Sequence, residues 1–182
     1  VSLICLYSCC SKLIAQSLKQ INMKYLEKIY DKILDDKSLD KKLNLWREKG
    51  RTLVFSNGCF DILHRGHVEY LSKAADLGDI LIIGLNTDDS VRRLKGPSRP
   101  VNDEKARAVV LAALEFVDAI MFFEEDTPYN LIKRVQPDVL VKGKDYKAED
   151  IVGYDIVTAK GGKVETIELV DGFSTTSILE RI

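Results

Sequence analysis

The chain has 182 residues, of which 46% are hydrophobic and 30% are charged, and its formal net charge is −1. This length allows one domain with a sizeable core. The balanced charge excludes a general electrostatic attraction to nucleic acid or to an anionic membrane, so we expect neither among the partners. An anionic substrate must therefore be bound by a local cluster of basic residues.

The first 22 residues (VSLICLYSCCSKLIAQSLKQIN) differ in composition from the rest of the chain, and the first methionine is Met23. Their apolar run ends at Ser11 and Lys12, too early to span a bilayer. No basic residue precedes Leu3, as a secretory signal would require. We expect Met23 to be the natural start and residues 1–22 to be a non-native or disordered upstream segment. The alternative is a genuine extension.

The four cysteines predict neither a disulfide framework nor a zinc ribbon. Three of them, Cys5, Cys9 and Cys10, lie in the first ten residues, Cys59 stands alone, and no C-x-x-C pair occurs. The reducing cytoplasm is the compartment that fits this usage most simply.

Residues 23–50 show a helical pattern. Apolar side chains recur at spacings of three and four, with a charged break between two groups, at Leu26, Ile29, Tyr30, Ile33 and Leu34 and then at Leu39, Leu43 and Trp46. The charged break is Asp35 to Lys37, and Gly50 is a helix stop. We expect a helical extension packed on the side of the main domain, the alternative being a surface for a partner protein.

From residue 51 to residue 182 the pattern alternates between strand and helix. Five apolar runs predict strands at Thr52–Ser56, Ile80–Leu85, Ala119–Phe123, Val139–Val141 and Val164–Leu169. Such alternation predicts an α/β fold, a Rossmann-like, doubly wound, five-stranded parallel sheet with helices on both faces. Ligands of such sheets bind beyond the carboxyl ends of the strands, at the point where the strand order reverses.

Two of the intervening helices have recognisable apolar faces. The first face comprises Val68, Leu71 and Ala75, and Gly78 ends that helix. The second comprises Ala106, Val109, Val110, Ala113 and Val117. Asn102 is the expected N-cap of the second helix, because Asp103 and Glu104 would then occupy its first turn.

The stretch VFSNGCFDILHRGH, residues 54–67, contains both histidines of the chain, His64 and His67. They lie three apart on one face of a predicted helix that follows a strand and a loop. Gly66 removes a side chain where a substrate group would approach. The helix N-terminus and two imidazoles together predict a small cationic pocket for phosphate oxygens. The alternatives are structural histidines or half of a metal site; without a third ligand we expect no zinc, and Cys59 is interpreted as a small apolar filler.

Four basic residues lie within eight positions, broken by Gly96, Pro97 and Pro100, and they are Arg92, Arg93, Lys95 and Arg99. This clustering predicts a loop that faces phosphate. Asp88 and Asp89 follow the strand at Ile80–Leu85, and we expect them to cap a helix rather than to hold an ion.

These residues resemble a known family. N-G-C-F-D-I-L-H-x-G-H (57–67) followed by L-G-D (77–79) resembles the HxGH cytidylyltransferase-like nucleotidyltransferases, which include glycerol-3-phosphate cytidylyltransferases. The resemblance is closer to the D-glycero-β-D-manno-heptose 1-phosphate adenylyltransferases. Four segments carry it: S-V-R-R-L-K-G-P-S-R-P-V-N (90–102), E-D-T-P (125–128), P-D-V-L-V-K-G-x-D-Y (137–146) and S-T-T-S-I (174–178). It covers residues 51–182 and not the first 50.

The resemblance implies an enzyme that transfers AMP from ATP, with Mg²⁺, to a heptose 1-phosphate and releases pyrophosphate, in the synthesis of heptose precursors of lipopolysaccharide or S-layer. A separate kinase would phosphorylate the heptose, and a homodimer is expected. The rival within the class is a CTP-dependent cytidylyltransferase acting on glycerol 3-phosphate or a similar alcohol phosphate. A rival outside it is a nucleotide-binding regulatory module without turnover.

The resemblance also implies roles for individual residues. His64, His67 and Lys95 would be catalytic, and Asp61 and Arg99 would bind the second substrate. The nucleotide would be bound by Asn57, Gly58, Cys59, Phe60, Gly66, Arg107, Gly143, Asp145, Tyr146, Ser174, Thr175 and Thr176. No protein residue is expected to ligate a metal.

The chemistry fits the residues present. Nucleotidyl transfer is an in-line displacement at phosphorus, in which charge builds on the nonbridging and leaving oxygens. The attacking sugar phosphate is already an anion, so a strong general base is unnecessary, and fixed positive charge with aligned donors suffices. The sequence has no G-x-x-x-x-G-K-[ST], which excludes a P-loop enzyme.

Overall fold

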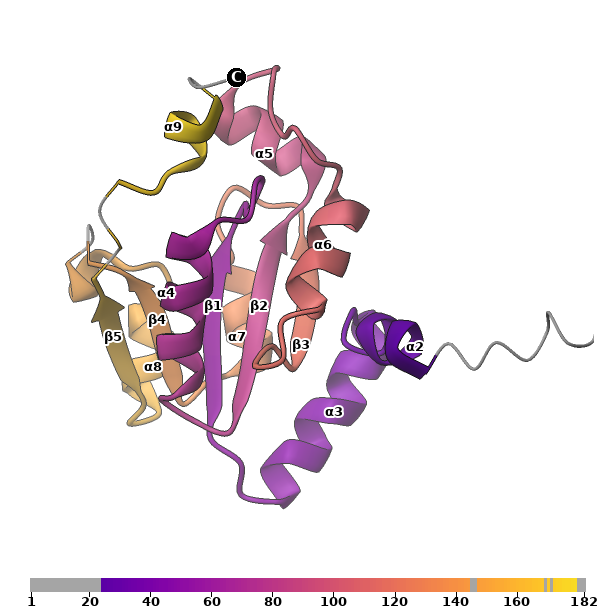
Figure 1. Cartoon of the computed structure of the whole chain (residues 1–182). Helices are drawn as coiled ribbons and strands as arrows, with labels where there is room; N and C mark the ends of the chain where they lie inside the picture. Colours follow the sequence, from indigo (N-terminus) through magenta and orange to yellow (C-terminus); the bar gives the residue numbers. More distant parts are fainter. Residues whose placement is uncertain (1–23, 145–146, 169, 171, 180–182) are drawn as a thin grey trace, which may run out of the picture.

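The computed structural model describes residues 24–144, 147–168, 170 and 172–179. The expectation for residues 1–22 and the sites Asp145 and Tyr146 lie outside these residues. Five parallel strands form one sheet in the order β3-β2-β1-β4-β5 (Figure 1). Their bounds are β1 Leu53–Gly58, β2 Ile80–Asn86, β3 Ala119–Phe123, β4 Val139–Gly143 and β5 Lys163–Ile167. The predicted doubly wound α/β sheet is confirmed.

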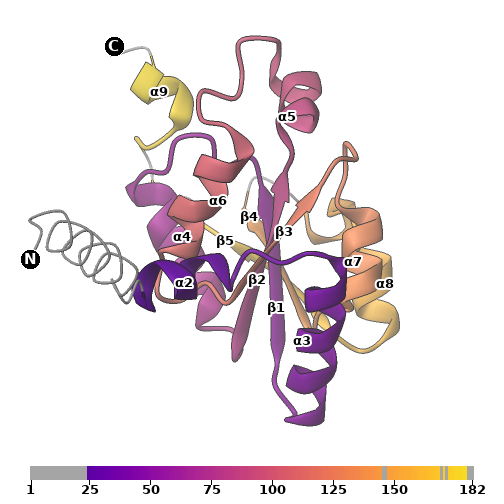
Figure 2. The same ribbon diagram turned by 90° about the vertical axis from the view of Figure 1, so that its right-hand side faces the viewer.

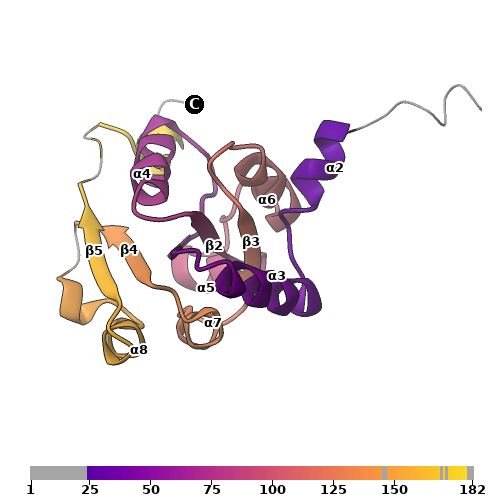
Figure 3. The same cartoon turned by 90° about the horizontal axis from the view of Figure 1, so that it is seen from below.

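Helices cover both faces of the sheet (Figure 3). One face carries α4 (Arg65–Ala75) and α6 (Glu104–Ala112), and the other carries α3 (Asp36–Glu48), α7 (Tyr129–Val135) and α8 (Tyr154–Ala159). Two apolar clusters fill the layers, one around Phe55 and Ile132 and the other around Leu71 and Ile83. Strand β2 reads ILIIGLN because its side chains are buried on both faces.

The N-terminal extension wraps around one edge of the sheet. Helix α2 (Lys24–Tyr30) packs beside α6, while α3 lies on the opposite face (Figure 2). Between them, Leu34 N donates to Ile120 O at 2.9 Å, and Ile120 N donates to Lys32 O at 2.8 Å. The linker therefore pairs with β3 and covers an edge that would otherwise present open hydrogen-bonding groups.

The charged break seen in the sequence has a local cause. Asp35 is the N-cap of α3 and forms a capping box with Ser38, since each side chain accepts from the other residue's backbone N–H. Gly50, just beyond the helix, adopts a φ of +62°, which suits a residue without Cβ.

Helix α6 differs from the prediction in its start and its buried face. Its N-cap is Asp103, not Asn102, and the Asp103 side chain accepts from Ala106 N. The Asn102 amide instead donates to Asp61 O at 2.9 Å, so it is unavailable as a cap. The buried face consists of Arg107, Ala108, Leu111 and Ala112, whereas Ala106, Val110 and Ala113 are exposed.

The basic stretch expected to be a loop is largely helical. Helix α5 spans Asp88–Lys95 with Thr87 as its N-cap, so only Arg99 of the four basic residues lies in the loop. Arg92 pairs with Asp89 and Arg93 pairs with Asp126, both on the exposed surface. Asp88 and Asp89 occupy the first turn, where carboxylates are favoured by the helix dipole, rather than the cap position itself.

The strand order places the reversal point between β1 and β4. The loops that follow the strands gather at their carboxyl ends, together with the short 3₁₀ helix η1 (Ala148–Asp150) and the terminal helix α9 (Thr175–Leu179). Within the described ranges, no helix combines the length and the apolar character needed to cross a membrane.

Candidate active site

A cavity of about 670 Å³ opens at the carboxyl ends of the strands. Most of the residues predicted to form the site line it together: Asn57, Gly58, Cys59, Phe60, Asp61, His64, Gly66, His67, Lys95, Arg99, Gly143, Ser174 and Thr175. They come from β1, the loop after it, α4, α5, the loop before α6, β4 and α9. Arg107 does not line the cavity, and the side chain of Thr176 lies outside the described part of the structure.

The two histidines form the centre of this site. His64 is the N-cap residue of α4, with extended backbone angles, and His67 lies in the first turn. Their rings stack with centroids 3.8 Å apart at 23°. The Nδ1 atoms of both rings are buried and have no hydrogen-bond partner. Because a buried unpaired polar atom is unfavourable, such a pair is expected where a ligand supplies the missing partners.

Burial favours the neutral form of both imidazoles. It lowers the pKa of His67 to about 4, with a further contribution from the neighbouring His64 ring. Burial also lowers the pKa of His64. In the neutral form the two rings have one N–H each to offer a phosphate oxygen, and in His67 this donation competes with a hydrogen bond to the backbone of Ile62. Added to the N–H groups of the first turn of α4, they provide aligned donors rather than fixed positive charge.

Local packing fixes the ring positions. A Cβ added to Gly66 would lie 3.1 Å from His64 Nδ1 and 3.2 Å from Phe173 Cβ, so a larger residue would displace the ring. Phe60 adopts a φ of +44°, a conformation that a bulky side chain rarely takes. The Phe60 ring meets His67 edge-on, with centroids 5.2 Å apart. The strained backbone of Phe60 thus places an aromatic wall against the His67 ring.

The reversal point between β1 and β4 is polar at its carboxyl end. The Asn57 Oδ1 atom is buried without a partner, and Lys142 Nζ lies 3.3 Å from Asn57 O. Lys142 lines the cavity and was not among the predicted residues. Its signal in the sequence was a single lysine after the apolar run Val139–Val141, immediately before Gly143.

Arg107 has a different environment from the one predicted. Its side chain is fully buried, and its nitrogens donate to Asn102 O at 3.1 Å, to Cys59 O at 2.6 Å and to Asn86 O at 2.8 Å. It also donates to Asp88 Oδ1 at 2.8 Å. Instead of pointing at a phosphate, Arg107 joins the loop after β1 to the ends of β2 and the starts of α5 and α6.

Cys59 is half-buried next to this network. Its Sγ lies 3.8 Å from Asn86 Oδ1, and burial raises the pKa of the thiol. A thiol with a raised pKa is a poor nucleophile, in agreement with the interpretation of Cys59 as a filler.

The far wall of the cavity comes from the C-terminal segment. Ser174 caps α9, because its Oγ accepts from Ser177 N at 3.0 Å. Phe173, which was not predicted, lies over the site with its ring centroid 6.4 Å from that of His64. A single aromatic residue before a serine gave no pattern from which this contact could be inferred.

The described residues include no group of three or more His, Cys, Asp or Glu side chains that could hold a metal ion. Asp126 and Asp150 do line the cavity. One or two carboxylates beside a phosphate chain are sufficient for Mg²⁺ that arrives with a nucleotide, because Mg²⁺ retains waters and binds substrate phosphates.

Comparison with known proteins agrees with this geometry. The family model described as cytidylyltransferase-like matches residues 55–181. The chain is 59% identical over 143 residues to "Bifunctional protein HldE" of Nitrobacter hamburgensis and 57% identical over 154 residues to that of Syntrophotalea carbinolica. These matches cover 79% and 84% of this chain but only 29% and 31% of the relatives, so the chain spans under a third of their length.

Two solved structures share the fold. A lipopolysaccharide core biosynthesis protein from Thermoplasma volcanium superposes with a TM-score of 0.55 at 30% identity, covering 66% of this chain and 98% of that one. Pantoate-beta-alanine ligase from Francisella tularensis superposes with a TM-score of 0.50 at 15% identity, covering 81% and 75%, and shows the fold alone. The matched family model spans well over half of the chain, including the histidine pair, most of β1 and the other four strands, and the chain therefore belongs to the cytidylyltransferase-like family of nucleotidyltransferases.

Proposed function

We propose that this chain transfers AMP from ATP to D-glycero-β-D-manno-heptose 1-phosphate, forming ADP-heptose and releasing pyrophosphate. The observation that carries the proposal is the stacked pair His64 and His67, with buried, unpartnered Nδ1 atoms at the N-terminus of α4. The heptose part of the proposal is supported by the sequence segments 90–102 and 137–146 and by the relatives named HldE. A sugar kinase must supply the 1-phosphate.

The transfer needs no general base. An oxygen of the sugar phosphate attacks the α-phosphorus of ATP, the bond to the oxygen that bridges the α- and β-phosphates breaks, and pyrophosphate leaves with that oxygen. No proton has to be removed from the attacking group, because it is ionised at neutral pH. His64 and His67 donate hydrogen bonds to the charge that builds on the phosphate oxygens in the transition state.

The surrounding residues orient the nucleotide. Asn57 and Lys142 stand at the reversal point, where nucleotides bind in doubly wound sheets. Lys95, at the end of α5 on the cavity rim, faces the phosphates. Mg²⁺ brought in with ATP would be held beside Asp126 or Asp150, which line the cavity, and would supply positive charge to the phosphate oxygens.

The base and the acceptor are tested in one experiment. Pyrophosphate release is measured with ATP and with CTP against a panel of sugar 1-phosphates and glycerol 3-phosphate. We expect ATP with the heptose 1-phosphate to give the highest kcat/KM, because a buried hydrogen-bonding group mismatched to the base costs about 1–3 kcal/mol. A higher kcat/KM with CTP and glycerol 3-phosphate would establish the cytidylyltransferase alternative, and no release with any pair would reject turnover altogether.

A further inference from the structure

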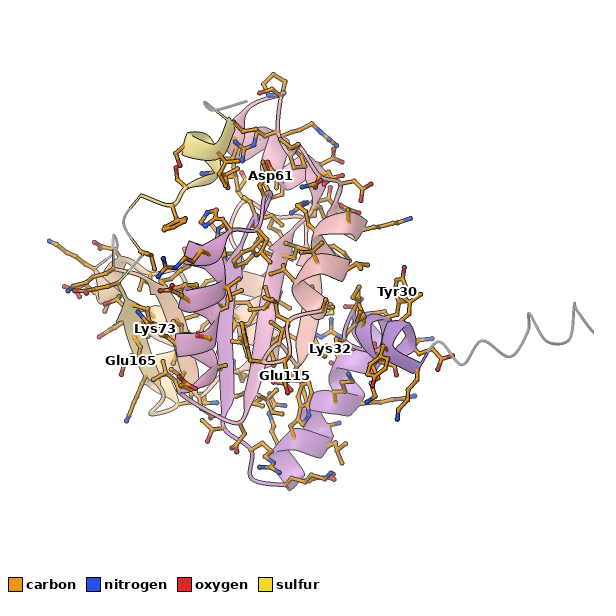
Figure 4. The ribbon with its side chains drawn as sticks, in the orientation of Figure 1. Tyr30, Lys32, Asp61, Lys73, Glu115 and Glu165 are labelled. Carbon is orange, nitrogen blue, oxygen red and sulfur yellow. The ribbon has the colours of Figure 1, made fainter. Side chains whose placement is uncertain are left out.

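Asp61 is a buried carboxylate that accepts three hydrogen bonds from the protein. Its side chain is 1% exposed, and Oδ1 accepts from Val101 N at 2.7 Å and from Asn102 N at 3.1 Å. Oδ2 accepts from Arg99 Nε at 2.5 Å. Figure 4 shows Asp61 at the carboxyl end of β1, close to α5 and α9. Asp61 lines the cavity, but its side chain is engaged by the protein, so we expect a role for it that acts through its partner.

That role is visible in Arg99. Only the Nε atom of Arg99 is bound, to Asp61, and its two Nη atoms have no acceptor in the part of the chain that the structure describes. The Arg99 side chain is 18% exposed and lines the cavity. A guanidinium held at Nε presents the two remaining nitrogens as a rigid fork, which matches two oxygens of one phosphate.

The topology separates Arg99 from the nucleotide. The reversal point, with Asn57 and Lys142, lies between β1 and β4. The loop that carries Arg99 follows α5, on the β2 side of β1, and its backbone is attached to Asp61. A nucleotide bound at the reversal point, with its phosphates at the N-terminus of α4, leaves the β2 side of the cavity open. In-line displacement requires the attacking group to enter opposite the leaving pyrophosphate.

We infer that Arg99 binds the phosphate of the second substrate, the sugar 1-phosphate, and that Asp61 is a positioning residue that holds Arg99 in place. The inference rests on the proposed function, since it assigns the acceptor subsite of that same cavity. It predicts that the subsite selects phosphate monoesters over uncharged sugars, because the Arg99 fork and not the sugar ring supplies the anchor.

The test compares acceptor KM, kcat and ATP affinity in variants of the full chain. In Arg99→Ala we expect the KM for the sugar 1-phosphate to rise about 10- to 100-fold, as for loss of a charged hydrogen bond. In Arg99→Lys it should rise nearly as far, because an ammonium lacks the fork. ATP affinity, measured by calorimetry without acceptor, should stay within about twofold of wild type.

Asp61→Asn keeps the shape of the side chain and removes its charge. We expect it to raise the acceptor KM in the same direction with little change in ATP affinity. In the Arg99→Ala background, Asp61→Asn should cause no further rise in KM, because a positioning residue acts only through the group it positions. A purely structural Asp61 would give additive effects and would lower the melting temperature in both backgrounds.

A second aspartate–arginine pair provides a matched control. At the amino ends of the strands, Asp79 accepts from Arg51 Nη1 at 3.0 Å and from Thr52 N at 2.9 Å, so it too joins an arginine to the backbone. Neither Asp79 nor Arg51 lines the cavity. Asp79→Asn and Arg51→Lys should therefore leave the acceptor KM and the ATP affinity unchanged.

If the wild-type enzyme is active, two results would overturn the inference without affecting the proposed function. They are an unchanged acceptor KM in Arg99→Ala and a tenfold loss of ATP affinity in the same variant. The second result would place Arg99 in the nucleotide subsite, and the calorimetry detects it whichever acceptor is used. If wild type releases no pyrophosphate with any phosphorylated acceptor, the proposed function fails and the inference fails with it. Variants that keep the wild-type melting temperature are compared throughout.

Discussion

Two groups of buried polar side chains lie side by side at the carboxyl end of the sheet, and they differ in how completely they are hydrogen-bonded. The guanidinium of Arg107 has four protein acceptors. His64 and His67 each bury an Nδ1 atom without a partner. Satisfied groups stabilise the fold, whereas unsatisfied ones are retained at a cost that binding of a ligand removes. Resemblance alone grouped Arg107 with the ligand-binding residues, and its hydrogen bonds separate it from them.

The largest expected effect on the free energy of unfolding comes from removing Arg107, whose hydrogen bonds are all made within the protein. Arg107→Ala leaves the carbonyls of Cys59, Asn86 and Asn102 and the carboxylate of Asp88 without their donor. Removing one partner of a buried ion pair destabilises proteins by about 3–5 kcal/mol. Urea denaturation should show a loss of this size. Arg134→Ala is the control, because Arg134 pairs with Asp36 and Asp40 on the surface, where ion pairs contribute little. An Arg107→Ala protein of wild-type stability that no longer binds ATP would reverse the assignment.

Substitution in the histidine pair should lower activity more than stability, the opposite of what we expect for Arg107. His67→Ala removes a donor to the transition state, and loss of one such donor lowers kcat by about 10²–10³-fold. ATP affinity should fall less, because Lys95 and the N-terminus of α4 still bind the ground state. The melting temperature should fall less than in Arg107→Ala, because one of the atoms removed with the ring, Nδ1, has no protein partner. A double variant with His64→Ala should lose less than the product of the single losses. Near-normal kcat in His67→Ala would refute the mechanism.

The burial of the His67 ring predicts a pH dependence of stability. The folded-state pKa of His67 is about 4 and its ordinary value is 6.5, so between these pH values the unfolded chain binds the proton and the folded chain does not. Stability should therefore fall as the pH is lowered through this window, by up to about 3 kcal/mol for this residue. Denaturation at pH 7, 5.5 and 4 should show a smaller decline in His67→Ala than in wild type. Equal declines would contradict the low pKa.

The sequence predicted the framework of this site well and its hydrogen bonding poorly. A continuous apolar run such as Ile80–Leu85 is typical of a strand buried on both faces, and it is strand β2. A strand leading into a glycine loop and a helix placed His64 and His67 correctly at the carboxyl end of β1. The same pattern gave no sign that Arg107 would be buried, because an arginine within an amphipathic helix is ordinarily exposed.

The contacts of Asp61 show why these details were not predictable. Its partners Arg99, Val101 and Asn102 lie about 40 positions away, at separations of 38 to 41 residues. Local patterns carry no information on such pairs. The same pairing engages Asn102 and moves the N-cap of α6 to Asp103, so one long-range contact accounts for two differences between prediction and structure.

Lys95 differs from both groups, because it is exposed rather than buried, and its substitution has the smallest predicted effect on activity and stability. It is exposed at the C-terminal end of α5, lines the cavity rim, and has no hydrogen bond to any residue that the structure describes. Lys95→Ala should therefore leave the melting temperature unchanged, because nothing in the fold depends on its ammonium. A lysine that meets a phosphate from the solvent side contributes one charged hydrogen bond, so ATP affinity and kcat should each fall by about tenfold. Lys105→Ala, an exposed lysine of α6 outside the cavity, is the matched control and should change neither quantity. If Lys95→Ala lowers kcat as strongly as His67→Ala while ATP affinity is unchanged, Lys95 acts on the transition state. A polar group that faces the cavity without a protein partner would then indicate a catalytic residue at the exposed rim, as it does at the buried histidine pair.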